Sequence, residues 1–122
     1  ADQQAQVRTQ LAMTLAGVIA QRLIPRADGT GRVAACEVLM GTPAVRNLVR
    51  ERKTHQMATA MQAGREHGMQ TMNQSLYRLY VTRQISLEEA LGRSPDVAEL
   101  EQMLSRGRAL GATKHEGRVY VR

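Results

Sequence analysis

Hydrophobic residues recur at helical spacing in the first part of the chain, and this pattern predicts a helix over roughly residues 3–21. The stripe consists of Val7, Leu11, Leu15, Val18 and Ile19. A short extended run over 22–26 follows, and Pro25 within it indicates an edge position or the end of a strand. Segment 27–31 has strong turn chemistry, because Asp and Gly tolerate the dihedral angles of turns. The pattern therefore predicts a helix that leads into a β-hairpin.

The second strand of the hairpin is predicted over 32–40, and both of its faces are mostly apolar. One face carries Ala34, Cys36, Val38 and Met40, and the other carries Val33, Ala35, Glu37 and Leu39. Such a strand is typical of a sheet that is covered on both sides, and two strands alone are only marginally stable in water. We therefore expect the hairpin to belong to a larger sheet, covered by another chain or by a domain outside these residues.

From residue 42 onward the periodicity is helical, and each predicted helix starts at a capping signal. The signals are Thr42 before Pro43, Thr54, Thr71 with Gln74, Ser86 with Glu89, and Ser94 before Pro95. The first of these helices is predicted to run to about Lys53, the second to stop near Gly64 and the fourth to end at Leu91. The apolar face of the last helix consists of Val97, Leu100, Met103 and Leu104. The periodicity then fades, so 107–122 are expected to form a basic, mobile tail, unless 118–121 add a short strand.

Composition leaves several classes of partner open. The chain has 122 residues, 43% of them hydrophobic, with no Phe or Trp and seven Met, so its core must be built from aliphatic side chains. Its net charge of +6 suits nucleic acid, an anionic membrane or an acidic protein surface. The scarcity of aromatic residues argues against single-stranded nucleic acid, which is bound by stacking. The longest apolar stretch, 11–20, is too short to span a bilayer.

The residue types that carry catalysis or bind cofactors do not form a recognisable site. No phosphate-binding loop of the type G-x-x-x-x-G-K-[ST] is present, and His55, His67 and His115 lack the spacing of metal ligands. Cys36, in the middle of a strand, is expected to be a buried, inert thiol, and Glu37 to be exposed or paired with an arginine. Adjacent glutamates, Glu88 and Glu89, suit the start of a helix better than acid–base catalysis. We therefore assign no catalytic, cofactor-binding or metal-binding residue.

Charged residues gather on the helix that begins at Pro43. They are Arg46, Arg50, Glu51, Arg52 and Lys53, and against the apolar stripe of Val45, Leu48 and Val49 they fall on the outer face. Such a face is either simply solvated or a surface that docks a partner. The sequence pattern alone does not decide between the two.

The same helix carries a family signature. Residues 44–51 closely resemble the AIRNLIRE motif of PilT-type ATPases, which retract type IV pili, with two Ile-to-Val differences. The motif here consists of Ala44, Val45, Arg46, Asn47, Leu48, Val49, Arg50 and Glu51. The resemblance extends in order over about 3–104 and includes 53–56, 68–76 and 85–91. Two positions depart from the family pattern: Asn73 stands where Asp is usual, and Arg52 where Gly is common.

The resemblance implies a fold class and a domain organisation. We expect an α+β fragment that is mostly α, with one N-terminal helix, a β-hairpin completing a RecA-like sheet, and a C-terminal helical subdomain. Residues 1–41 would hold the last helix and hairpin of a RecA-like ATPase domain, 42–106 the helical subdomain, and 107–122 the basic tail.

The resemblance also implies a function for the parent protein, a hexameric, cytoplasmic ATPase of pilus retraction and twitching motility that works with ATP and Mg²⁺. The nucleotide motifs of the family lie before the part that this chain resembles, so the chain alone is expected to be inactive and to hold no cofactor. Its expected partners are the rest of the ATPase, neighbouring subunits and the pilus machinery at the inner membrane. Residues 44–51 would act in coupling or at an interface. The alternatives are a free-standing basic module that binds nucleic acid and a truncated module that joins hexamers of an intact relative.

Overall fold

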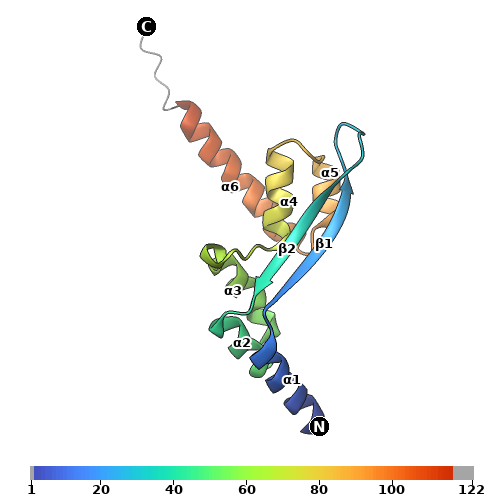
Figure 1. The fold of residues 1–122 in the computed structure, drawn as a ribbon. Coiled ribbons are helices and arrows are strands. Elements are labelled where there is room, and N and C mark those ends of the chain that lie inside the picture. The colour runs from blue at the N-terminus through green and yellow to red at the C-terminus, as the bar shows by residue number, and fades with distance from the viewer. Residues whose placement is uncertain (1, 117–122) are drawn as a thin grey trace.

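The computed structural model describes the backbone of residues 2–116 and the side chains of residues 3–109. Its elements are α1 (Asp2–Thr14), β1 (Gly17–Pro25), β2 (Arg32–Met40), α2 (Pro43–Arg50), α3 (Met57–Ala63), α4 (Met72–Val81), α5 (Leu87–Arg93) and α6 (Val97–Glu116), with 3-10 turns at Thr54–Gln56 and Arg65–His67. The first three helices gather at one end of the hairpin, α4 and α5 lie along its other end, and α6 leads away (Figure 1). The α+β, mostly helical fold is confirmed. No helix in the described part of the chain is long and apolar enough to cross a membrane.

The first helix is shorter than its hydrophobic spacing predicts. It ends at Thr14, and residues 17–21, which the pattern assigns to the helix, form the first half of β1. All nine residues of β1 pair antiparallel with β2, from Gly17 opposite Met40 to Pro25 opposite Arg32. Spacing alone cannot separate helix from strand over a short apolar run. Pairing with β2 decides the outcome, because it satisfies the backbone groups on the edge of β1 that faces β2.

The two faces of the hairpin differ in what covers them. On one face, Ile24 and Ala35 are fully buried against the helices. On the same face, Arg22 reaches the end of α5, where its Nη1 donates to the carbonyl of Arg93 (2.7 Å). The opposite face leaves Ile19 72% and Leu23 53% exposed. One apolar face of the hairpin is therefore uncovered within the described residues.

The outer edge of β2 is capped by the segment that starts α4. Val38 exchanges two backbone hydrogen bonds with Gln70 (2.8 and 3.0 Å), and the Cys36 N–H donates to the Ser75 hydroxyl (3.0 Å). Gln70 Nε2 also donates to the Cys36 carbonyl (2.6 Å). These bonds close the sheet on this side. The edge of β1 carries no further strand in the part of the chain that the structure describes.

Two apolar clusters hold the helices together. The larger one joins the hairpin to α4, α5 and α6 and consists of Ile24, Ala35, Met72, Leu76, Leu79, Ile85, Ala90, Leu100 and Leu104. The smaller one joins α2 to α3 and to the segment before α4, and consists of Val45, Met61 and Met69. Of the predicted inward residues of α6, Leu100 and Leu104 are buried, whereas Val97 is 43% exposed.

Several helix ends are set by contacts that the sequence signals did not show. The first helix of the C-terminal part, α2, ends at Arg50 and not at Lys53. Asp96 caps α6 in place of Ser94, because its Oδ1 accepts from the Glu99 N–H (3.1 Å). At its far end α6 continues to Glu116, beyond the point where the hydrophobic periodicity fades.

The capping predictions for α4 and α5 have different outcomes. Thr71 and Gln74 form the predicted capping box in full. At α5, Ser86 accepts from the Glu89 N–H (3.1 Å), but the Glu89 carboxylate pairs with Arg93 (3.4 Å). The short strand considered for 118–121 lies outside the described residues.

Candidate functional site

The AIRNLIRE-like segment forms α2, which is seated by a cap and by one buried residue. The Thr42 hydroxyl accepts from the Val45 N–H (3.3 Å), and Pro43 occupies the first turn, where its missing N–H costs nothing. Val45 is completely buried in the smaller cluster, and Leu48 and Val49 are half-buried. The predicted apolar stripe therefore faces the protein.

The end of α2 is a Schellman turn, in which a left-handed residue closes the last carbonyls. Arg52 takes this position with φ of 60°, and its N–H points to the Val49 carbonyl (3.4 Å). The Lys53 N–H donates to the Leu48 carbonyl (2.9 Å). Glycine adopts this conformation at the lowest cost, which gives a physical reason for the family preference for Gly at the position of Arg52.

The exposed face of α2 carries Ala44, Asn47, Arg50 and Glu51. Asn47 Nδ2 donates to Glu51 Oε1 (3.3 Å), and Lys53 Nζ lies 2.8 Å from Glu51 Oε2. The hydrogen bond and charge of Lys53 hold the pKa of the Glu51 carboxyl below its ordinary value. This face thus presents an exposed amide, a carboxylate and basic side chains.

Arg46 departs from its predicted place on the outer face. It is half-buried and reaches across to the end of α1, where its Nη2 donates to the Leu15 carbonyl (3.3 Å). Its Nε is buried and has no hydrogen-bond partner among the described residues. Arg46 therefore ties α2 to the junction of α1 and β1, a contact between residues 31 positions apart. No local sequence signal could have indicated it, because the predicted first helix continued past Leu15.

Gly41 holds the same junction from the other side. Its N–H donates to the Ala16 carbonyl (2.8 Å), and a Cβ at this position would lie 2.0 Å from the Leu15 carbonyl oxygen. Only a residue without a side chain fits here without a shift of the backbone. The chain therefore enters α2 through a tight contact with the end of α1.

The remaining candidates from the sequence lie apart from α2 or have structural roles. His55 and His67 are exposed, and the side chain of His115 lies outside the described residues. Cys36 is half-buried, not fully buried, because it lies on the uncovered face of the hairpin. Glu37 is neither exposed nor paired with an arginine; its Oε2 accepts from the Met72 N–H (3.0 Å) and so caps the start of α4.

The glycine-containing turn after β1 does not fit a nucleotide phosphate. The Asp28 carboxylate accepts from both the N–H (2.9 Å) and the hydroxyl (2.6 Å) of Thr30, and these bonds lower the pKa of Asp28. A phosphate needs free donors, whereas this turn presents a carboxylate. The prediction of a plain hairpin turn agrees with this geometry.

The chain was compared with known proteins. No protein-family model matches it. It is 38% identical over 107 residues to the type IV pilus ATPase PilU of Pseudomonas aeruginosa, covering 88% of this chain and 28% of PilU. It is 48% identical over 90 residues to the retraction ATPase PilT of the same organism, covering 74% of this chain and 26% of PilT. A crystal structure of the pilus retraction motor PilT with bound ADP matches 83% of this chain and 27% of that one, with 48% identity and a TM-score of 0.72.

The chain is a homologue of the PilT and PilU type IV pilus ATPases. It spans about a quarter of the length of these relatives. The ATPase DotB of Legionella pneumophila, at 22% identity and a TM-score of 0.53, shares the fold over 70% of this chain. The resemblance of the chain to the PilT family is thus confirmed, and the role of residues 44–51 remains a prediction.

Proposed function

We propose that these residues are the C-terminal part of a hexameric PilT-like ATPase that powers type IV pilus retraction and twitching motility. In this proposal, α2 is the coupling element and carries no nucleotide chemistry. The observation that supports this role is that the two sides of one short helix differ. Val45 is fully buried, while Asn47, Arg50 and Glu51 are exposed. A rigidly seated helix with a charged outer face can transmit a movement or dock a partner without acting on ATP.

The contacts at the start of α2 support a coupling role. Arg46 and Gly41 both join α2 to the end of α1 through the Leu15–Ala16 backbone. The segment after Leu15 becomes β1, which pairs with β2 along its whole length. A displacement of the hairpin would therefore carry the end of α1 and the start of α2 with it. This mechanical connection is the physical basis of the proposed coupling.

The uncovered face of the hairpin supports packing against the remainder of the ATPase. Ile19, Leu23 and Met40 are exposed on it, and the edge of β1 is free within the described residues. Exposed apolar patches on one face of a sheet indicate contact with other protein. We place the rest of the RecA-like domain over this face, with further contacts to neighbouring subunits in the ring.

ATP and Mg²⁺ would be bound by the other parts of the parent protein. Phosphoryl transfer needs groups that hold the phosphates and the metal ion, and the turn at 27–31 offers a carboxylate in their place. The pilus machinery at the cytoplasmic face of the inner membrane would be the target of the exposed face of α2.

The test separates ATP turnover from retraction. Full-length protein with Arg50→Ala or Asn47→Ala is produced in cells that lack the native gene, and twitching is measured beside the ATPase rate of the purified protein. We expect twitching to be lost while ATP turnover is kept. The matched control is Arg83→Ala, which removes an exposed arginine after α4 and should change neither. If the α2 variants lower ATP turnover and twitching in parallel, or leave twitching intact, α2 is not the coupling element.

A further inference from the structure

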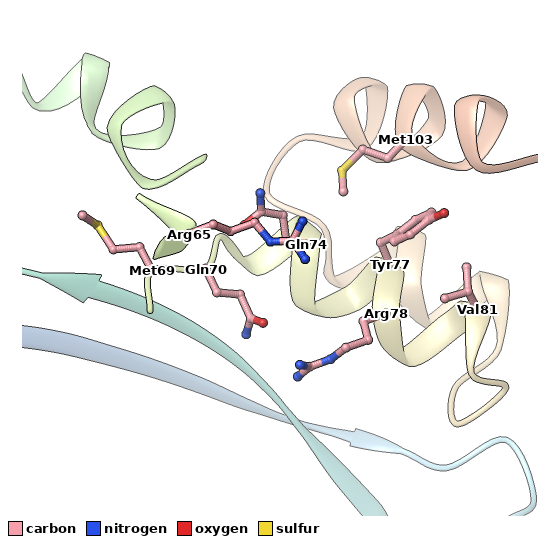
Figure 2. Close-up of a pocket in the computed structure, with 8 residues that line it drawn as sticks. All are labelled: Arg65, Met69, Gln70, Gln74, Tyr77, Arg78, Val81 and Met103. Carbon is pink, nitrogen blue, oxygen red and sulfur yellow. The ribbon is translucent and has the colours of Figure 1, made fainter. Parts of the chain in front are cut away.

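A groove of about 340 Å³ lies between α4, α6 and the segment that precedes α4. Its floor is one face of α4, formed by Gln74, Tyr77, Arg78 and Val81 at successive helical positions. This is the face opposite the buried residues of α4. Met103 of α6 lies across the groove from Tyr77, and Arg65 lies beside Gln74 (Figure 2).

The charge of this groove is one-sided. Arg65 and Arg78 are exposed, neither guanidinium forms an ion pair in the described part of the chain, and no acidic residue lines the groove. Over Gln74 and Met103 the groove adjoins a second hollow of about 310 Å³, which adds Arg106. Free guanidinium groups around an apolar strip are the complement of a ligand with carboxylates on an apolar body.

The one acidic side chain of the second hollow is already engaged. Glu99 Oε2 accepts from Asn73 Nδ2 (2.5 Å), and its other oxygen accepts from Gln62 Nε2. Its carboxylate therefore links α6 to both α4 and α3. Glu99 shares only the second hollow, with Arg106, and none of Arg65, Arg78 and Arg106 forms an ion pair within the described residues.

Tyr77 is held in the groove by a matching gap in α6. A Cβ on Gly107 would lie 2.2 Å from the Tyr77 hydroxyl oxygen, so the absence of a side chain at Gly107 makes room for the phenol ring. Tyr77 is half-buried and Val81 is 50% exposed. The two side chains, with Met103, leave apolar surface next to the arginines that a partner can cover.

We propose that this groove binds an acidic, amphipathic segment of a partner protein. Carboxylates of the segment pair with Arg65 and Arg78, and its apolar side chains cover Tyr77, Val81 and Met103. The segment is taken to be helical, because helices present apolar anchors and charges on adjoining faces. Gln70 Oε1 and Gln74 Nε2 provide the remaining polar contacts, because Gln70 Nε2 already bonds to the Cys36 carbonyl and Gln74 Oε1 to the Thr71 N–H. This surface is separate from α2, and the proposal does not depend on the role of that helix.

The test uses the full-length protein and a fluorescein-labelled helical peptide made of Glu, Leu and Ala, with a peptide carrying Gln in place of Glu as the reference. Fluorescence anisotropy gives the dissociation constant. We expect the Glu peptide to bind and Arg65→Gln/Arg78→Gln to weaken it by at least about tenfold, since two charged hydrogen bonds are lost. Gly107→Ala, which leaves the charge unchanged, should weaken it severalfold by displacing Tyr77. The control Arg8→Gln/Arg32→Gln removes the same charge from α1 and β2 and should bind as the unchanged protein does.

Four outcomes would overturn the proposal. The full-length protein could fail to bind the peptide, which would mean that its own chain covers the groove. The control pair could lose as much affinity as the groove pair, so that net charge alone explains binding. The Gln peptide could bind as tightly as the Glu peptide. Lastly, a single-stranded oligonucleotide could bind more tightly than the peptide in a manner that depends on Arg65 and Arg78, which would assign the groove to nucleic acid.

Discussion

Substituting Gly41 with alanine tests the contact that fixes the start of α2. The added Cβ would lie 2.0 Å from the Leu15 carbonyl oxygen, 2.9 Å from the Leu15 carbonyl carbon and 3.1 Å from the Ala16 oxygen. All three atoms belong to the backbone, so no side chain can rotate away to make room. The substitution must move the end of α1 away from the start of α2.

The cost can be estimated from two effects. Forcing a methyl group into a filled site typically costs about 1–3 kcal/mol through strain and backbone shifts. The shift also stretches or breaks the hydrogen bond from the Gly41 N–H to the Ala16 carbonyl, now 2.8 Å, which is worth about 0.5–1.5 kcal/mol. We therefore expect Gly41→Ala to lower the free energy of unfolding by about 2–4 kcal/mol.

The measurement is urea-induced unfolding followed by circular dichroism, with Gly92→Ala as the matched control. Gly92 lies inside α5, and a Cβ there meets no atom within 4 Å. Alanine at this position should raise the free energy of unfolding by about 0.5–1 kcal/mol, because glycine is a poor helix former. The same chemical change thus has opposite expected effects at the two sites. If Gly41→Ala is as harmless as Gly92→Ala, the close contact between α1 and the start of α2 does not hold.

Three further predictions concern other contacts. Arg52→Gly should raise the free energy of unfolding by about 0.5–1 kcal/mol, because φ of 60° is unfavourable for a side chain; no gain in urea denaturation would contradict the turn. Asn73→Asp should lower the free energy of unfolding by about 3 kcal/mol at neutral pH, because a buried carboxylate would then face Glu99. In a double-mutant cycle, adding Glu99→Gln should restore most of this loss. Lys53→Met should raise the pKa of Glu51 toward its ordinary value of 4.5, as followed by NMR titration of the carboxyl carbon. Because the pKa of Glu51 is lowered in the folded protein, its stabilising contact with Lys53 is present above about pH 4.5 and is lost as the pH falls through the folded pKa. An unchanged pKa of Glu51 in the Lys53→Met variant would rule out Lys53 as the cause of the lowered pKa.

Local signals along the chain determine the features that depend only on neighbouring residues. The starts of α2 and α4 follow from Thr42 before Pro43 and from Thr71 with Gln74. Each threonine hydroxyl accepts from the N–H three residues on, and the Gln74 side chain accepts from the Thr71 N–H. The range of β2, 32–40, agrees with the prediction from its mostly apolar run after the turn at 27–31. Recognition of the PilT family also came from sequence, because several motifs occur in the family order.

Features that depend on residues far apart in the chain were decided by the tertiary structure. The boundary between α1 and β1 was missed because an apolar run from 11 to 20 suits both helix and strand, and only pairing with β2 distinguishes them. In the sequence Glu37 is an isolated acidic residue in an apolar strand. Only the tertiary structure shows that the Met72 N–H at the start of α4 donates to its carboxylate. Likewise the groove arginines, Arg65 and Arg78, are 13 positions apart, and only the tertiary structure shows that they line one groove.

The residues of the AIRNLIRE-like helix show both kinds of information. Its cap and its apolar stripe could be derived from spacing, since a helix with 3.6 residues per turn places Val45, Leu48 and Val49 on one side. The position of Arg46 could not, because its hydrogen bond to Leu15 depends on where α1 ends. Sequence by itself thus determined the family and the local form of α2. The tertiary structure decided what α2 is attached to, because hydrogen bonds and packing between distant segments leave no periodic signal in the chain.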